Sequence, residues 1–152
     1  MILSKKVSFL SLLYIFYCFS FIQAEKKIIC EIGAFIEDSD GSNAVLIDSG
    51  RAKDDFTSCD EEHQKKCIQT VETQVIEGTG NGNFSLSVDK EEYTIGDVLC
   101  DKADAVEENI RHKMIQIYWR LCDSKWKRTS FKMPEPLCCE DGLYVPCNKL
   151  SS

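Results

Sequence analysis

The segment MIQIYWRL, residues 114–121, decides how the rest of the sequence is interpreted. Apolar residues alternate strictly along it from Ile115 to Leu121, as in a strand with one face in a core. The apolar residues that precede it recur at steps of three and four, as in an amphipathic helix. We therefore predict a helix over about 101–112, followed by a strand over about 114–121.

Further strands are expected on both sides of this segment. β-Branched and apolar residues dominate IICEIGAFI, and the dense turn signal EDSDGSN separates it from the short stretch AVLID. The stretch FSLSV alternates between apolar residues and serines, so we expect Leu86 to lie in the core and Ser87 to face water. The predicted strands cover residues 28–36, 44–48, 68–76, 84–88, 114–121, 129–133 and, at most, 143–145.

A short helix from Asp60 is also expected, because the run DEEHQKK places acids before bases in the order that the helix dipole favours. About six short strands, with one helix late in the chain, predict a mainly β fold. We therefore expect a β-sandwich stapled by disulfides.

The first 24 residues have the features of a secretory signal peptide. Lys5 and Lys6 form a charged start, the apolar run 7–22 follows, and FIQA leads into the charged EKK. The apolar run is short of the ~20 residues needed to span a bilayer, which argues against a membrane anchor. We predict that residues 1–24 are removed and that 25–152 form one secreted, extracellular cysteine-rich β-domain that does not span a membrane.

Nine cysteines become eight once Cys18 leaves with the signal peptide. An even number in an oxidising compartment predicts four disulfides, each stabilising the fold by ~2–4 kcal/mol. Eight cysteines allow about 105 pairings, so the pairing stays open. Zinc is the competing interpretation, but there is no C-x-x-C pair, and the two histidines lack ligand spacing to the cysteines. The expected disulfide cysteines are Cys30, Cys59, Cys67, Cys100, Cys122, Cys138, Cys139 and Cys147.

The chain is acidic, with 25 acidic against 18 basic residues and a net charge of −7. Such a surface repels phosphate backbones, so we expect no nucleic-acid partner. One basic cluster surrounds an aromatic residue, which makes it a candidate site for an anionic lipid headgroup or polysaccharide. The alternative is a polar hairpin that flanks two strands. The cluster consists of Arg120, Lys125, Trp126, Lys127 and Arg128.

Candidate catalytic and metal chemistry is sparse. The turn EDSDGSN carries three acids, but placing Gly41 at the sixth position of a calcium loop puts Ile36 first and Ile47 twelfth, and neither can bind calcium. The two histidines, His63 and His112, are expected in solvated, charged surroundings, and no G-x-S-x-G or H-E-x-x-H motif is present. We predict no enzyme, no metal site and no other cofactor.

One modification site is predicted. The stretch NFS, residues 83–85, is an N-glycosylation sequon without proline in the middle. The alternation that turns Phe84 inward would turn Asn83 outward, where a glycan can be attached.

The order of these signals resembles the nematode transthyretin-like family of secreted proteins. The similarity covers about residues 79–135: a glycine-rich turn into GNFSLS, the acidic DKEEYTIGD, then IQIYWRLCD and WKRTSFKMPE. A weaker echo lies in IICEIGAFIEDSDGSNAVLID. The sequence departs from the family in an apparent insertion over 100–114, a long polar stretch over 50–66 and an excess of cysteines. The resemblance implies a transthyretin-like β-sandwich with a non-enzymatic carrier or bridging role.

Our leading functional hypothesis is a secreted binding protein that engages an extracellular protein or a lipid surface. The alternatives are a cysteine-rich inhibitor or signalling ligand that acts on a protease or receptor, and an enzyme with a dispersed carboxylate site. The disulfide map discriminates between the first two. A bond from Cys138 or Cys139 to Cys147 would close a tail loop and favour the inhibitor or ligand, whereas a bond to Cys30, Cys100 or Cys122 would indicate a structural staple.

Overall fold

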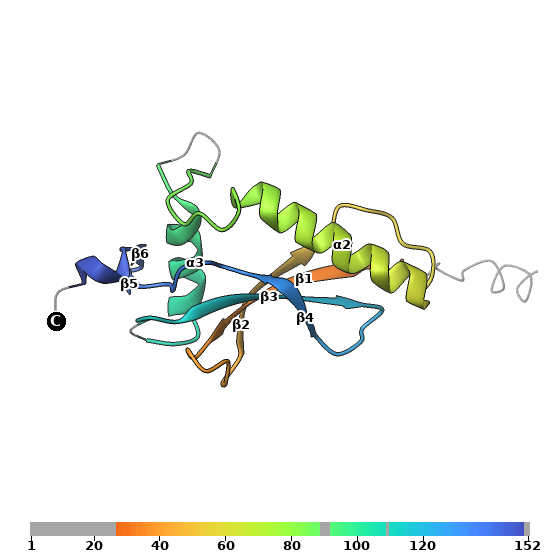
Figure 1. Cartoon of the computed structure of the whole chain (residues 1–152), viewed down its shortest axis with the longest axis horizontal. Coiled ribbons are helices and arrows are strands. Elements are labelled where there is room, and N and C mark those ends of the chain that lie inside the picture. Colours follow the sequence, from red (N-terminus) through yellow and green to blue (C-terminus); the bar gives the residue numbers. More distant parts are fainter. Residues whose placement is uncertain (1–26, 89–91, 109, 151–152) are drawn as a thin grey trace, which may run out of the picture.

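A four-stranded antiparallel sheet forms the centre of the computed structural model, which describes residues 27–88, 92–108 and 110–150. Its strands lie in the order β2-β1-β3-β4 (Figure 1). The predicted signal peptide, residues 1–24, lies outside the described residues. The elements are β1 Cys30–Glu37, β2 Val45–Arg51, α2 Glu61–Gly78, α3 Ile95–Asp104, β3 Met114–Leu121, β4 Lys127–Lys132, β5 Cys139–Glu140, β6 Leu143–Tyr144 and the 3-10 turn η1 Cys147–Lys149.

The two central strands, β1 and β3, pair along their whole length, from Cys30 opposite Leu121 to Glu37 opposite Met114. Directly opposite residues in an antiparallel pair point to the same face of the sheet. The alternating apolar residues of β3, which are buried, therefore share a face with every second residue of β1. The strand predicted over 114–121 is confirmed, and the strands predicted over 28–36, 44–48 and 129–133 correspond to β1, β2 and β4.

Helix α2 crosses one face of this sheet and packs on β1, β3 and β4 (Figure 1). Cys67 and Val71 form its fully buried stripe, and the disulfide between Cys30 and Cys67 joins the helix to the first residue of β1. The helix begins where the carboxylate of Asp60 accepts a hydrogen bond from the backbone N–H of His63 at 2.9 Å. This N-cap satisfies one of the donors that a helix start leaves unpaired.

The strand predicted over 68–76 is wrong, because these residues belong to α2. Val71 and Val75 fit both periods, since residues four apart lie on one face of a strand and also on one face of a helix. The capped start and the disulfide at Cys67 fix the helical alternative, and the helix continues to Gly78. The short helix predicted from Asp60 therefore has the right start and the wrong end.

The strand predicted over 84–88 is also wrong. Phe84 is buried, but Leu86 is 37% exposed, and the only ladder contact in this stretch is an isolated bridge between Ser87 and Thr94. The carbonyls of Phe84 and Leu86 accept hydrogen bonds from the first N–H groups of α3, both at 2.8 Å. The stretch thus caps a helix, and its backbone is not available for a sheet.

The late helix begins and ends earlier than predicted. α3 covers Ile95–Asp104 instead of about 101–112, because Thr94 and Asp97 form a reciprocal capping box that starts it. The backbone N–H of Thr94 donates to Asp97 at 2.8 Å, and the N–H of Asp97 donates to the Thr94 hydroxyl at 3.2 Å. His112, expected on a helix, lies instead in the loop before β3 with a left-handed φ of 55°.

The predicted β-sandwich is not confirmed, although the fold is mainly β as expected. A sandwich needs a second sheet packed on the first, but here one face of the four-stranded sheet is covered by the helix α2. The second sheet in the described part of the chain is only the short pairing of β5 with β6. The hairpin turn predicted at EDSDGSN connects β1 to β2, with Gly41 and Asn43 at positive φ. None of the described helices is long and apolar enough to cross a membrane.

We expect Ile115→Ala to lower the free energy of unfolding by about 2–5 kcal/mol, because Ile115 is fully buried and its removal leaves a cavity. Leu86→Ala is the matched control and should change it by no more than about 0.5 kcal/mol, since Leu86 lies at the surface. Urea unfolding of the oxidised protein measures both values. Equal losses in the two variants would contradict the core described here.

Candidate functional site

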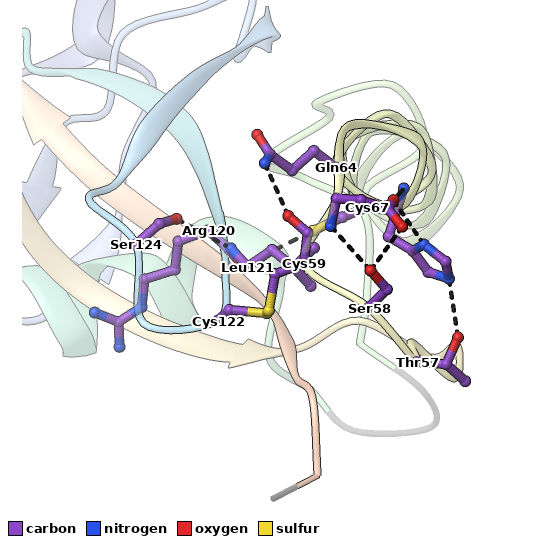
Figure 2. Close-up of a disulfide and its surroundings, with 11 residues drawn as sticks. Thr57, Ser58, Cys59, Gln64, Cys67, Arg120, Leu121, Cys122 and Ser124 are labelled. Carbon is purple, nitrogen blue, oxygen red and sulfur yellow. Dashed lines mark hydrogen bonds and ion pairs between the residues drawn. A yellow bond between two sulfur atoms is a disulfide. The ribbon is translucent and has the colours of Figure 1, made fainter.

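All eight predicted cysteines form disulfides. The pairs are Cys30–Cys67, Cys59–Cys122, Cys100–Cys139 and Cys138–Cys147. Figure 2 shows how Cys59–Cys122 joins the chain before α2 to the turn after β3, with the Gln64 amide directed at the Cys59 carbonyl. The predicted four-disulfide framework is therefore confirmed.

The adjacent cysteines Cys138 and Cys139 form one disulfide of each kind that was expected to discriminate between the functional hypotheses. Cys138 bonds to Cys147 and closes a loop with a sequence separation of 9, as expected for an inhibitor or ligand. Cys139 bonds to Cys100 in α3, as expected for a structural staple. The tail is thus closed on itself and also fixed to the domain. We call residues 138–147 the tail hairpin.

The tail hairpin is built around β5 and β6, and the short strand predicted at 143–145 corresponds to β6. Asp141 and Gly142 connect them with φ values of 52° and 76°, the left-handed conformation that a tight two-residue hairpin turn requires. Leu143 is 49% exposed at the tip. The hairpin therefore projects an acidic and apolar tip from a rigid base.

Its base is held against α3 by Tyr144. The Tyr144 backbone N–H donates to Asp97 at 2.9 Å, and the ring packs against Phe84 with centroids 5.3 Å apart. A Cβ on Gly96 would lie 2.4 Å from the Tyr144 ring, so this close approach requires glycine at position 96. Hydrogen bonds from Thr94 and Tyr144 lower the pKa of Asp97 against the opposing effect of burial.

A groove of about 510 Å³ lies beside the hairpin. Four of the side chains that line it are carboxylates, from the end of α3, the following loop and the hairpin tip, and one is a guanidinium. We call it the acidic groove; its lining residues are Asp104, Glu108, Arg111, Cys139, Glu140 and Asp141. Charge of this sign favours a positively charged partner.

The predicted basic cluster does not form one continuous basic surface. Arg120 makes a bidentate ion pair with Glu31, at 2.6 and 3.1 Å, and stacks on Trp126 at 4.4 Å from the ring. The bond to Glu31 raises the pKa of Arg120. Arg120 also lines a groove of about 610 Å³ that contains Arg51 and Asp123 as well, so this groove carries charges of both signs.

The other members of the cluster point in different directions. Arg128 donates to the Tyr118 hydroxyl at 2.7 Å and to the buried Glu37 at 2.8 Å, on the sheet face opposite α2. Lys127 reaches Gln64 of α2 at 3.0 Å. Lys125 is exposed in the turn between β3 and β4. Because the arginines are paired with carboxylates, the polar-hairpin interpretation fits this region better than an anion site.

His63 lies in a network that the sequence did not indicate. Its Nε2 is 3.0 Å from the Thr57 hydroxyl, and its Nδ1 is 2.9 Å from an Asp60 carboxylate oxygen. This order of hydroxyl, ring and carboxylate is that of a hydrolase triad. However, Asp60 is also the N-cap of α2, and its side chain is 54% exposed, so water competes for every contact. We assign the network to helix capping.

The predicted glycosylation site, Asn83, lies between α2 and α3. Asn83 is exposed, and its side chain accepts a hydrogen bond from the Ser85 N–H at 3.0 Å; glycosylation there stays a prediction.

The T-x-x-D spacing of Thr94 and Asp97 is a sequence signal that could have indicated the start of α3. The acidic groove had no such signal, since its residues come from distant segments.

Comparison with protein families, curated proteins and solved structures finds no match to this chain. The resemblance to the transthyretin-like family therefore stays a prediction.

The Asp60 network predicts a pH dependence. Hydrogen bonds from Ser58 and from the backbone and ring of His63 hold the pKa of Asp60 well below its usual value near 3.9. A carboxyl whose pKa is lower in the folded chain than in the unfolded chain stabilises the fold at pH values above its pKa in the unfolded chain. This stabilisation is lost as the pH falls, first through the pKa of the unfolded chain and then through that of the folded chain.

We expect Asp60→Asn to retain the cap at neutral pH, because Asn is an equally good N-cap. The variant should lose less stability than the wild type between about pH 5 and pH 2, because over this range Asp60 takes up a proton in the unfolded chain and not in the folded one. Urea midpoints across this range measure the difference. Parallel pH curves for the two proteins would show that Asp60 does not contribute.

Proposed function

We propose that the protein is a secreted, non-enzymatic binding protein that engages a positively charged extracellular protein through the tail hairpin and the acidic groove. The observation that carries this proposal is the double disulfide attachment of the hairpin, which fixes an exposed tip to α3. A surface that is already ordered loses little conformational entropy on binding, which favours affinity. The proposal includes removal of residues 1–24 as a signal peptide and a glycan on Asn83.

The chemistry of the partner follows from charge. The hairpin tip places Glu140 and Asp141 beside Asp104 and Glu108, the other two carboxylates of the acidic groove, and Leu143 adds an exposed apolar contact. Complementary charge accelerates association, and an apolar anchor within a polar rim supplies affinity. An anionic lipid surface is a weaker candidate, because Arg120 and Arg128 are paired with Glu31 and Glu37. The resemblance to transthyretin-like carriers supports the same class of function.

A second candidate is a secreted inhibitor or signalling ligand. It is favoured by the Cys138–Cys147 bond, which closes the short loop that such proteins present to a protease or receptor. The two candidates use the same surface and differ in the partner. Identification of the partner therefore decides between them.

The test starts with capture by the immobilised mature protein from the extracellular proteins of the source organism, followed by mass spectrometry. Association with the retained protein is then measured for the wild type and for Glu140→Gln with Asp141→Asn. Asn tolerates the left-handed φ of position 141, so this double variant removes charge and keeps the turn.

We expect the association rate of the double variant to fall roughly tenfold at low salt, and the difference to shrink at high salt. Lys125→Gln is the control, because Lys125 is exposed on a different hairpin, and it should associate at the wild-type rate or faster. An unchanged association rate in the double variant would refute the proposal. It would also be refuted if no protein were captured and the mature protein bound instead to phosphatidylserine vesicles.

A further inference from the structure

The structure brings His112 next to the Cys138–Cys147 disulfide. A ring nitrogen of His112 and the sulfurs of both cysteines lie within 4.8 Å of one another. The His112 backbone N–H also donates to the Cys138 sulfur at 3.1 Å. In the sequence these residues have no metal-ligand spacing, so only the fold places them together.

This arrangement is rigid on the side of His112. Lys113 and Leu137 exchange backbone hydrogen bonds at 2.7 and 3.2 Å, which hold the residues that precede β3 beside the residues that precede β5. The Cα atoms of Cys138 and Cys147 are 5.2 Å apart, and Cys139 remains tied to α3 through Cys100. The two sulfurs would therefore stay close to each other and to His112 if the bond between them were opened.

We propose that His112, Cys138 and Cys147 form a Zn²⁺ site when the Cys138–Cys147 disulfide is reduced. An imidazole and two thiolates are a ligand set that zinc prefers, with bonds of about 2.0–2.1 Å to nitrogen and 2.3 Å to sulfur and a water in the fourth position. Ligand atoms at these bond lengths lie within the 4.8 Å spread observed here. The His112 N–H is placed to donate to the Cys138 thiolate, as outer-shell donors do in metal sites.

The reaction is balanced by a small dithiol as reductant. The dithiol gives two electrons and two protons to the S–S bond and is itself oxidised to a disulfide, and zinc then displaces the two protons from the thiols. Cys138–Cys147 closes the shortest loop of the four disulfides, so its loss relaxes the unfolded chain least. The site shares the Cys138–Cys147 bond with the proposed binding surface but uses none of its exposed tip residues, so metal binding can be tested without the partner.

The experiment treats the oxidised mature protein, residues 25–152, with limiting dithiothreitol under nitrogen. Alkylation and peptide mass spectrometry then identify which cysteines were reduced. Co²⁺ replaces Zn²⁺ as the probe, because thiolate ligation gives it a characteristic charge-transfer absorption, and Zn²⁺ is then added to displace it. We expect one Co²⁺ per chain and reduction confined to Cys138 and Cys147.

His112→Asn is the decisive variant, because Asn tolerates the left-handed φ of 55° at this position. It should bind Co²⁺ at least tenfold more weakly, whereas His112→Cys should restore a ligand and His63→Asn should bind like the wild type. Cys138→Ser with Cys147→Ser should abolish the absorption with the other three disulfides intact. Equal binding by His112→Asn, or survival of Cys138–Cys147 until the other three bonds are reduced, would overturn the proposal.

Discussion

The pairing of β1 with β3 is the constraint on which the rest of the structure depends. It joins residues as far apart in sequence as Glu31 and Arg120, so the chain must close a long loop before any of its hydrogen bonds can form. Two disulfides shorten this loop. Cys30–Cys67 starts at the first residue of β1 and Cys59–Cys122 ends just after β3, so the two strands are covalently linked through the short segment 59–67. This link shortens the loop roughly tenfold. Each halving of the loop length lowers the entropic cost of closing it by about 0.6 kcal/mol.

The same pairing gives the sheet two chemically different faces. On one face, the apolar residues of β1 and β3 pack under α2. On the other, Trp126 lies over Gly33, where an added Cβ would approach the Trp126 ring to 3.0 Å, and Phe35 packs on Tyr118 with centroids 4.3 Å apart. Arg120 and Arg128 extend this aromatic row, and each is neutralised by a glutamate. The ion pairs and the contacts with aromatic rings order this water-facing surface. Because the positive charge of each arginine is balanced by a glutamate, the two arginines do not create a strong attraction for an anionic ligand.

The tail follows from the geometry of two adjacent cysteines. Neighbouring residues in an extended segment point to opposite sides, so Cys138 and Cys139 reach partners on opposite sides of the chain. One side chain reaches Cys147 and closes the hairpin, while the other reaches Cys100 and fixes the hairpin to α3. The exposed tip, the acidic groove and the position of His112 beside a sulfur pair all depend on this division.

The sequence alone determined the features that depend on local pattern: the strand at 114–121, the turn at EDSDGSN, the start of a helix at Asp60 and the presence of four disulfides. It did not determine whether Val71 and Val75 belong to a helix or a strand, because residues four apart share a face in both. The alternation at 84–88 was also insufficient, since a strand needs a neighbour, and here the backbone of Phe84 and Leu86 is used by the start of α3. Only the tertiary structure decided the cysteine pairing, the ion pairs of Arg120 and Arg128 with Glu31 and Glu37, and the approach of His112 to Cys138. Each of these depends on distances between segments far apart in the chain, which no local pattern encodes.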